Sequence, residues 1–392
     1  MAHHELIVIG SGPAGVMAAR GYLDAGGSGP VTVFTADVDQ PYQRPPLSKE
    51  MLQDTAGEPH VLPILEGAGE LDGIDVVLGR RAAAVDPLHH TVTVGEDEHT
   101  YDRLVLAPGA HPTPLPVADD DAQVHYLRSL SDARALSAAA AHARTAVVIG
   151  SGFIGCEAAA SLAIRGIETT LVTPESGPQA VRLGEHASRA ISGWLTELGV
   201  RLVTDTSVTG VLAPRTVHTD GGHTYEPDLV LAAIGITPST DFLHGSGIAM
   251  YDDRIVVDER LRTTMRDVWA AGDAVHAHHA RAGRTLSVEH WGDASTMGEI
   301  AGRGAAGQDA EWIDPPGFWS EIGQHQLKYS AWGDGWDDLS VTERAGGFTV
   351  RYGREQQLAG VLTYGADDDY EIAADQLGRA RFSSAGSDDG SQ

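Results

Sequence analysis

Two stretches of this chain share one pattern: a short apolar run, a glycine-rich turn and an alanine-rich segment with helical character. The first apolar run covers residues 6–9 and is followed by GSGPAG; the second covers residues 146–149 and is followed by GSGFIG. A short apolar run bounded by glycine predicts a buried strand, and the alanine-rich segment behind each turn predicts a helix. The sequence therefore predicts two strand–turn–helix units, which are the building blocks of parallel α/β sheets.

The spacing of the glycines predicts what the two turns bind. In G-x-G-x-x-G, the first glycine makes the tight turn, the second lets the backbone approach a pyrophosphate, and the third lets helix and strand pack closely. The pyrophosphate then rests on the free N–H groups of the helix N-terminus. Two such loops indicate two dinucleotides on one chain and electron transfer between them. The loop residues concerned are Gly10, Gly12, Pro13, Ala14 and Gly15, and Gly150, Gly152, Phe153, Ile154 and Gly155.

Further apolar runs and turn signals divide the chain into an α/β fold with two Rossmann-like domains, the second inserted in the first, and a C-terminal α+β domain. We expect a first domain over 1–116 and 246–311, a second over 117–245, a third over 312–380, and a disordered tail over 381–392. Expected strands cover 31–34, 74–78, 91–94, 103–107 and 168–172, and expected helices cover 13–26, 131–142, 153–165, 185–198, 293–307 and 369–379.

Composition narrows the class of protein. The 392 residues carry a formal net charge of −28, which argues against nucleic acid or an anionic membrane as a partner. We see no secretory signal and no apolar run that could span a bilayer, so we expect a cytoplasmic protein. Only two residues are lysines, Lys49 and Lys328, so a lysine within a motif points to a site that needs a compact ammonium.

Cys156 is the one cysteine in the chain, so no internal disulfide can form. It directly follows Gly155, and we interpret it as a small buried core residue. The block HAHH at 276–279 invites a metal-site reading, but without an ordered carboxylate or cysteine partner we interpret it as a solvated loop. No metal is expected.

Several motifs together resemble one known family. They are the first glycine loop, PYQRPPLSK at 41–49, the second loop with Glu157, Ala271-Gly272-Asp273, Val288-Glu289-His290-Trp291 and Phe318-Trp319-Ser320. The chain resembles FAD-dependent ferredoxin reductases of bacterial oxygenase systems and the related apoptosis-inducing-factor-like NADH oxidoreductases. These belong to the pyridine nucleotide-disulfide oxidoreductase superfamily but lack its redox disulfide.

The resemblance implies that FAD occupies the first loop and that Lys49 lies near flavin N5, paired with Glu157. A buried lysine needs a facing carboxylate, and a cation beside N5 favours the reduced flavin. Glu157 could instead be an ordinary first-turn glutamate that complements the helix dipole. Lys49 and Glu157 are the expected catalytic pair. The expected FAD-binding residues are the first-loop residues together with Asp37, Arg44, Pro45, Lys49, Ala107, Gly109, Arg128, Gly272, Asp273, His290, Trp291 and Trp319.

The nicotinamide cofactor is then expected at the second loop, with Glu157, Glu175 and Gly235 among its contacts. Many family members have a glutamate at the position of Thr173, whereas this chain has Glu175. An acid there would bond the ribose 2′-hydroxyl and repel a 2′-phosphate, so NADH is expected and NADPH is the weaker alternative. Asp37 is the corresponding acid after the second strand of the first unit.

The absence of a Cys-x4-Cys pair excludes a dithiol mechanism, so electrons must leave from the flavin edge. Our first hypothesis is an NADH-dependent reductase of ferredoxin or a similar small iron–sulfur protein, as monomer or homodimer. Because ferredoxins are generally acidic, a local basic patch would be needed, and Arg80-Arg81 or Arg281 with Arg284 could supply it. The alternatives are an apoptosis-inducing-factor-like NADH oxidase using small acceptors or oxygen, with redox-linked oligomerisation, and a non-catalytic flavin-bound interaction protein.

Overall fold

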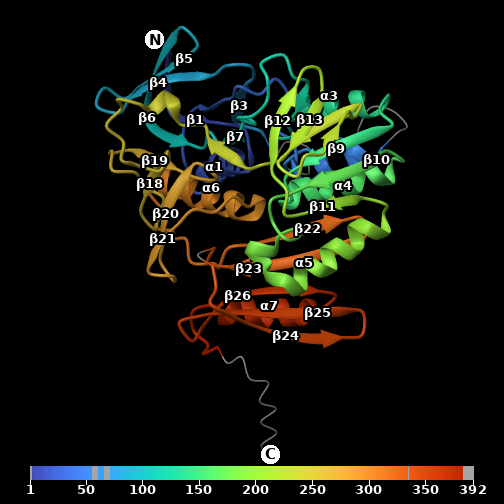
Figure 1. The fold of residues 1–392 in the computed structure, drawn as a ribbon. Coiled ribbons are helices and arrows are strands. Elements are labelled where there is room, and N and C mark those ends of the chain that lie inside the picture. The colour runs from blue at the N-terminus through green and yellow to red at the C-terminus, as the bar shows by residue number, and fades with distance from the viewer. Residues whose placement is uncertain (1, 55–60, 66–70, 334, 383–392) are drawn as a thin grey trace, which may run out of the picture.

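The computed structural model describes residues 2–54, 61–65, 71–333 and 335–382. In Figure 1 an N-terminal unit, a central unit and a C-terminal sheet meet around a common centre. The predicted fold class is confirmed: two units built on parallel strands are followed by an antiparallel sheet with a covering helix.

The first unit is a mixed sheet in the order β3-β2-β1-β6-β5-β4, with β19 parallel to β6. The apolar run predicted as a strand is the inner part of β1, where residues 6–9 are buried. The strands are β1 (Ala2–Ile9), β2 (Val31–Phe34), β3 (Ile74–Val77), β4 (Ala82–Asp86), β5 (Thr91–Val94), β6 (Asp97–Leu106) and β19 (Val268–Ala270).

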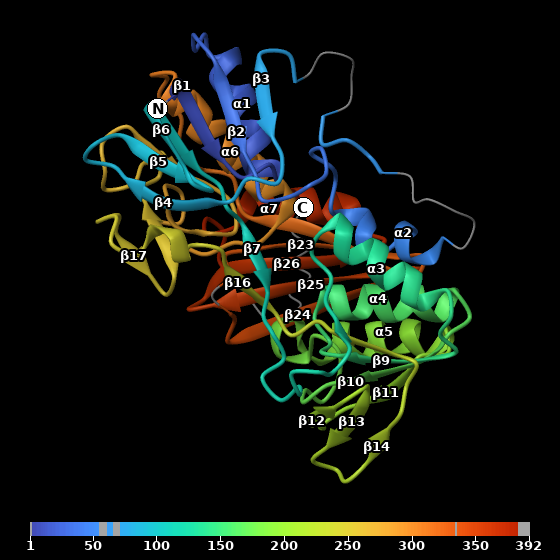
Figure 2. The same cartoon turned by 90° about the horizontal axis from the view of Figure 1, so that it is seen from above.

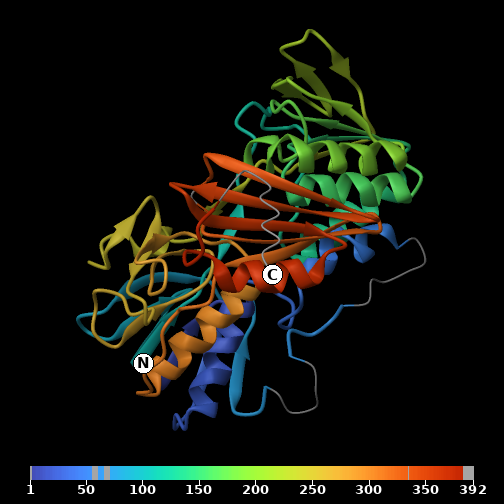
Figure 3. The ribbon, with the colours of Figure 1, turned by 90° about the horizontal axis from the view of Figure 1, so that it is seen from below.

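Helix α1 (Pro13–Asp24) packs against α6 (Trp291–Ala305), and Figure 3 shows the two side by side. Glycines bring the two backbones into contact. A Cβ atom on Gly298 would lie 2.1 Å from the carbonyl oxygen of Ala14, and one on Gly302 would lie 2.0 Å from that of Ala18. The chain therefore returns, after the inserted unit, to complete the first one.

The second unit is a parallel sheet in the order β11-β10-β9-β15-β8, with a small antiparallel sheet at the end far from the N-terminus (Figure 2). Its helices are α3 (Leu130–Ala140), α4 (Phe153–Ile164) and α5 (Ala180–Glu197). Its strands are β8 (Val124–His125), β9 (Thr145–Ile149), β10 (Glu168–Val172), β11 (Arg201–Val203), β12 (Val208–Leu212), β13 (Thr216–Thr219), β14 (Thr224–Tyr225) and β15 (Leu229–Ala232). The helix predicted over 185–198 begins earlier, because a separate turn precedes a kink at Gly184.

Short elements connect these units. The two crossover segments pair with each other as an antiparallel ribbon of β7 (Ala110–Pro112) and β16 (Ile236–Pro238). The Pro-rich motif forms η1 (Pro45–Ser48) and leads into α2 (Glu50–Gln53), and η2 (Asp241–Leu243) follows β16.

The histidine block is not a solvated loop, contrary to the sequence interpretation. It lies in β20 (Val275–His279), within a sheet that also contains β17 (Met250–Tyr251), β18 (Arg254–Val257) and β21 (Arg284–Leu286). His279 is fully buried, and its Nε2 lies 2.9 Å from the carbonyl oxygen of Asp314. Alternation along the strand turns His279 inward, and burial lowers its pKa.

The C-terminal sheet is antiparallel in the order β22-β23-β26-β25-β24, covered on one face by α7 (Figure 3). The elements are β22 (Gly317–Ile322), β23 (His325–Ala331), β24 (Asp338–Arg344), β25 (Gly347–Arg354), β26 (Gln357–Tyr364) and α7 (Asp367–Gln376). The expected tail is wrong at its start: Arg381 bridges Gln357, and the Phe382 N–H donates to the Gln356 carbonyl at 2.9 Å. Residues 383–392 lie outside the described part of the chain. None of the helices in the described ranges is long and apolar enough to span a bilayer.

Candidate active site

A cavity of about 1360 Å³ runs from the first glycine loop to the second and is bordered by the C-terminal sheet. Typical single-ligand pockets measure roughly 300–1,000 Å³. A cavity of this size, lined by residues of both glycine loops, has room for two ligands.

Most residues expected to bind the cofactors border this cavity. They are Gly10, Gly12, Pro13, Ala14, Asp37, Arg44, Pro45, Lys49, Ala107, Gly109, Arg128, Gly152, Phe153, Ile154, Glu157, Gly235, Gly272, Asp273, His290, Trp291 and Trp319. Gly15, Gly150, Gly155 and Glu175 do not border it. The three glycines serve packing instead: a Cβ on Gly15 would lie 1.8 Å from the Gly10 carbonyl oxygen, and one on Gly155 2.1 Å from that of Gly150.

The first loop leaves a helix N-terminus open to an anion. Gly10 has φ +105°, and a Cβ there would lie 2.0 Å from the carbonyl oxygen of Ala107. Gly12 is the N-cap of α1, and no side chain caps its N–H groups. Gly152 is the N-cap of α4, and no side chain caps that helix end either. Both helix ends therefore present N–H groups and a positive dipole end to a phosphate.

Arg44 adds a partly buried cation to the first loop. One guanidinium nitrogen would lie 2.8 Å from a Cβ on Gly12, and its Nε has no hydrogen-bond partner among the described residues. Burial lowers the pKa of Arg44, and the nearest acid, Asp37, is 3.8 Å away. An orphaned buried donor over an uncapped helix end fits the pyrophosphate of FAD.

Asp37 is already engaged by another side chain. The Tyr42 hydroxyl donates to it at 2.8 Å and accepts from the Leu130 N–H at 2.8 Å. Burial raises the pKa of Tyr42 to about 12, which keeps this donor protonated. One oxygen of Asp37 thus braces the motif around Tyr42, and a ribose contact is a proposal for the other.

Each glycine loop is held by a hydrogen bond between a serine and a threonine hydroxyl, which the sequence did not predict. Ser11 Oγ donates to Thr35 Oγ1 at 3.0 Å, and Ser151 Oγ lies 2.7 Å from Thr173 Oγ1. Thr35 and Thr173 each follow the second strand of their unit directly. The only available signal was that a threonine follows this strand in both units.

Lys49 and Glu157 form the expected ion pair. Lys49 Nζ lies 3.0 Å from Glu157 Oε2 and also donates to the Pro45 carbonyl at 2.9 Å. The hydroxyls of Ser48 and Ser320 donate to the two oxygens of Glu157 at 2.5 and 2.7 Å. All of these donors come from segments other than α4. Glu157 therefore joins the first unit, the second unit and the C-terminal sheet at the wall of the cavity.

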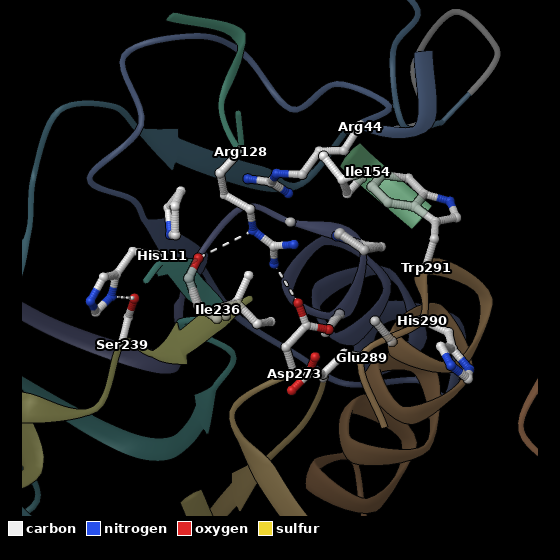
Figure 4. Close-up of a pocket in the computed structure, with 18 of the residues that line it drawn as sticks. Arg44, His111, Arg128, Ile154, Ile236, Ser239, Asp273, Glu289, His290 and Trp291 are labelled. Atoms are coloured by element: carbon white, nitrogen blue, oxygen red, sulfur yellow. Dashed lines mark hydrogen bonds and ion pairs between the residues drawn. The ribbon is translucent and has the colours of Figure 1, made fainter. Parts of the chain in front are cut away.

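A second ion pair of the cavity joins Arg128 and Asp273, and Figure 4 shows the Arg128 side chain directed at that carboxylate. The Arg128 Nε also donates to the Ala110 carbonyl at 3.2 Å, which fixes the guanidinium beside the crossover ribbon. Asp273 follows β19 by three residues, at the end of the strand that returns to the first sheet. This places a charged pair where the chain enters and leaves the inserted unit.

Aromatic side chains close one side of the cavity. Phe318 packs on Phe153 and on His290, with ring centroids 4.7 and 4.6 Å apart. His290 Nδ1 lies 3.0 Å from the buried Asp293 carboxylate. Trp291 borders the cavity, as Figure 4 shows, and Trp319 borders it while remaining 43% exposed. An exposed indole beside the cavity gives a route by which an electron could reach the surface.

Glu175 binds the protein backbone rather than lining the cavity. Its carboxylate accepts the Val181 N–H at 2.9 Å, at the first turn of α5. Gln179, Val181 and Arg182 line the cavity at this point instead. This segment was not singled out from the sequence, because the predicted helix began beyond it.

The remaining candidates are structural. Cys156 is fully buried, as expected, and burial raises its pKa, so it is no thiolate. Arg80 is paired with Asp97, and Arg281 donates to the carbonyls of Asp375 and Leu377. Neither is a free basic group for an acidic partner. Within the described ranges, no cluster of three or more potential metal ligands occurs.

Comparison with known proteins agrees with this geometry. The family model "Pyridine nucleotide-disulphide oxidoreductase" matches residues 4–298. Human apoptosis-inducing factor 3 is 30% identical over 86% of this chain, which spans only 56% of that relative's length. A ferredoxin--NAD(P)(+) reductase of a Sphingomonas species is 30% identical, over 94% of this chain and 91% of its own length.

Among solved structures, the covalent putidaredoxin reductase–putidaredoxin complex contains a chain that superposes with a TM-score of 0.87 and 26% identity. The match covers 96% of this chain and 94% of the other. The uncapped glycine loops, the cavity between them and the extent of the family match lead to one conclusion: this chain belongs to the pyridine nucleotide-disulphide oxidoreductase family.

Proposed function

We propose that this protein is an FAD-dependent NADH:acceptor oxidoreductase that delivers electrons to ferredoxin or a similar small iron–sulfur protein. The observation that carries the proposal is the Lys49–Glu157 pair, which lies in one cavity between two phosphate-binding loops. Bound FAD supplies the step from two-electron to one-electron chemistry. The first-loop glycines, Arg44 and Asp273 would hold it, and the second loop would hold the nicotinamide nucleotide.

The chain's own residues suit this role. Lys49 places a positive charge in a largely water-excluded site, where such a charge acts more strongly than in water. With a single cysteine in the whole sequence, no dithiol can carry electrons onward. The exposed Trp319 supports an exit to a docked protein, and similarity to ferredoxin reductases over nearly the full length supports an iron–sulfur acceptor. A cytoplasmic location stays a prediction from the sequence.

We expect turnover to depend on an iron–sulfur protein. Purified protein with NADH should reduce cytochrome c rapidly only when a [2Fe–2S] ferredoxin or a rubredoxin is added. Because a net charge of −28 repels acidic partners, the best acceptor in such a panel should have a less acidic docking face. The apparent KM for the more acidic acceptors should fall as salt rises, because salt screens the repulsion. Equal turnover on a quinone or oxygen alone, with dimerisation on reduction, would favour the second candidate, suggested by the similarity to apoptosis-inducing factor 3.

We also propose that NADH is preferred over NADPH. Glu175 lies beside the cavity segment at Val181, where a carboxylate charge would repel a 2′-phosphate. We expect kcat/KM for NADH to exceed that for NADPH by roughly tenfold or more, a difference of about 1.4 kcal/mol.

Glu175→Gln keeps an acceptor for the Val181 N–H and removes the charge. It should therefore reduce the ratio of kcat/KM for NADH to that for NADPH. Arg182→Ala is the comparison, because Arg182 lines the cavity next to Val181, whose N–H donates to Glu175. If E175Q left the NADH/NADPH ratio of kcat/KM unchanged while R182A abolished NADPH turnover, Arg182 and not Glu175 would be the residue that sets selectivity.

A further inference from the structure

Helix α5 begins with a separate turn that faces the cavity. Gly184 adopts φ +79° and ψ 171° inside the helix, so residues 180–183 form their own turn before the main helix continues. Val181 and Arg182, on that turn, line the cavity. The kink thus decides which way these two side chains point.

Side chains from the C-terminal sheet and its loop donate hydrogen bonds to the backbone at this kink. Trp336 Nε1 donates to the Arg182 carbonyl at 3.0 Å, and the Tyr352 hydroxyl donates to the Leu183 carbonyl at 2.9 Å. Tyr352 and Leu183 are almost fully buried, and burial raises the pKa of Tyr352 well above its ordinary value, so its hydroxyl stays a donor. In Figure 1, α5 lies along the C-terminal sheet.

The same contact leaves no room for a side chain at the kink. A Cβ atom on Gly184 would lie 2.9 Å from Leu339 Cδ2 and 3.3 Å from the Trp336 ring. Gly333 and Gly335, in the loop that carries Trp336, also line the cavity. The loop that carries Trp336 and the turn at residues 180–183 therefore both border the cavity.

The start of α5 also contacts the second glycine loop. Gln179, at the start of α5, has a left-handed backbone (φ 58°), and its side-chain amide donates to the Ser151 carbonyl at 3.3 Å. Glu175 binds the Val181 N–H from the other side. A continuous set of contacts thus runs from the C-terminal sheet through residues 179–184 to the phosphate-binding loop.

We propose that Trp336 and Tyr352 are positioning residues for the nicotinamide dinucleotide: from the C-terminal sheet they hold residues 179–184 in the kinked conformation that completes its adenosine-side binding surface. They do not touch the ligand. The C-terminal sheet then serves the nucleotide as well as the electron acceptor. This inference rests on the proposed binding of NADH at the second loop.

The test measures binding of ADP-ribose and NAD⁺ to the FAD-loaded protein by calorimetry, together with amide hydrogen exchange of residues 180–184. Tyr352→Phe keeps the ring and removes one donor. Trp336→Phe also removes one donor but replaces the indole by a smaller aromatic ring. Because a backbone carbonyl of the kinked turn then loses its donor, we expect Kd to rise by about three- to tenfold in each, and faster exchange at 180–184. FAD content should be unchanged, and KM for NADH should rise with kcat nearly constant.

Tyr364→Phe is the matched control. Tyr364 also lies on the C-terminal sheet, and its ring packs on Trp194 farther along α5, at 4.8 Å between centroids. Unchanged ADP-ribose affinity and exchange in both test variants would overturn the inference, and so would an equal loss in Y364F, which would indicate general loosening of the sheet from α5. If the unaltered protein bound neither ligand, the proposed function would fail and this inference with it.

Discussion

Replacing Lys49 with methionine is expected to slow the reduction of bound FAD by NADH roughly 100-fold, while FAD stays bound. The substitution removes the cation that faces Glu157 at 3.0 Å and leaves a buried carboxylate whose other donors, among the described residues, are the hydroxyls of Ser48 and Ser320. Negative charge that develops in the cavity during electron uptake would then be repelled by the unpaired Glu157 carboxylate. Anaerobic stopped-flow absorbance of the flavin on mixing with NADH measures the rate.

Lys328→Met provides the control, since Lys328 is the only other lysine and forms a partly exposed pair with Asp367. It should reduce at the rate of the unaltered protein. Because an unpaired buried carboxylate also destabilises the fold by about 3–5 kcal/mol, the double variant K49M/E157Q separates the two effects. It should recover thermal stability and still reduce slowly. If the flavin in the single variant K49M were reduced at the rate of the unaltered protein, Lys49 would not be a catalytic residue.

Replacing Gly298 with alanine should lower the stability of the fold strongly. The new Cβ would lie 2.1 Å from the Ala14 carbonyl oxygen, on the helix that begins at the first glycine loop, so α1 and α6 must move apart. Overpacking typically costs about 1–3 kcal/mol, and a clash with the backbone of Ala14 puts this case at or above the upper end. We expect FAD to be released at a temperature at least several degrees lower, measured by the rise of free flavin fluorescence on heating.

Gly193→Ala is the comparison for that experiment. Gly193 lies within α5, and no atom stands within 4 Å of the position a Cβ would take. Alanine there should stabilise the helix by up to about 1 kcal/mol or leave it unchanged. If G298A released FAD at the temperature of the unaltered protein, the close approach of α1 and α6 would not exist in solution.

The sequence predicted most of the elements that are set by local signals. Apolar runs ending in glycine located β1 and β9, and the motif around Lys49 located one half of the ion pair at the cavity. Such features depend on residues that are close in the chain, or on a motif whose spacing carries its own chemical reason.

What the sequence missed depends on contacts between distant segments. Ser320 reaches Glu157 from 163 residues away, and Tyr352 reaches Leu183 from 169 residues away. A single serine or tyrosine in a strand has no local signal that names such a partner. His279 was misread for the same reason: its histidine-rich neighbourhood is polar, but the strand places that one side chain against Trp312 and Trp332.

The pairing of α1 with α6 and of β6 with β19 has a consequence for how the protein is made. A ribosome delivers the first sheet long before it delivers the strand and helix that complete it. At about 5–20 residues per second, the roughly 190 residues between positions 116 and 305 take on the order of ten to forty seconds to synthesise. During that interval the N-terminal segment lacks the strand that completes its sheet and the helix that covers α1. We therefore expect the first glycine loop to reach its final packing, and a cofactor to bind there, only after residue 305 has been synthesised.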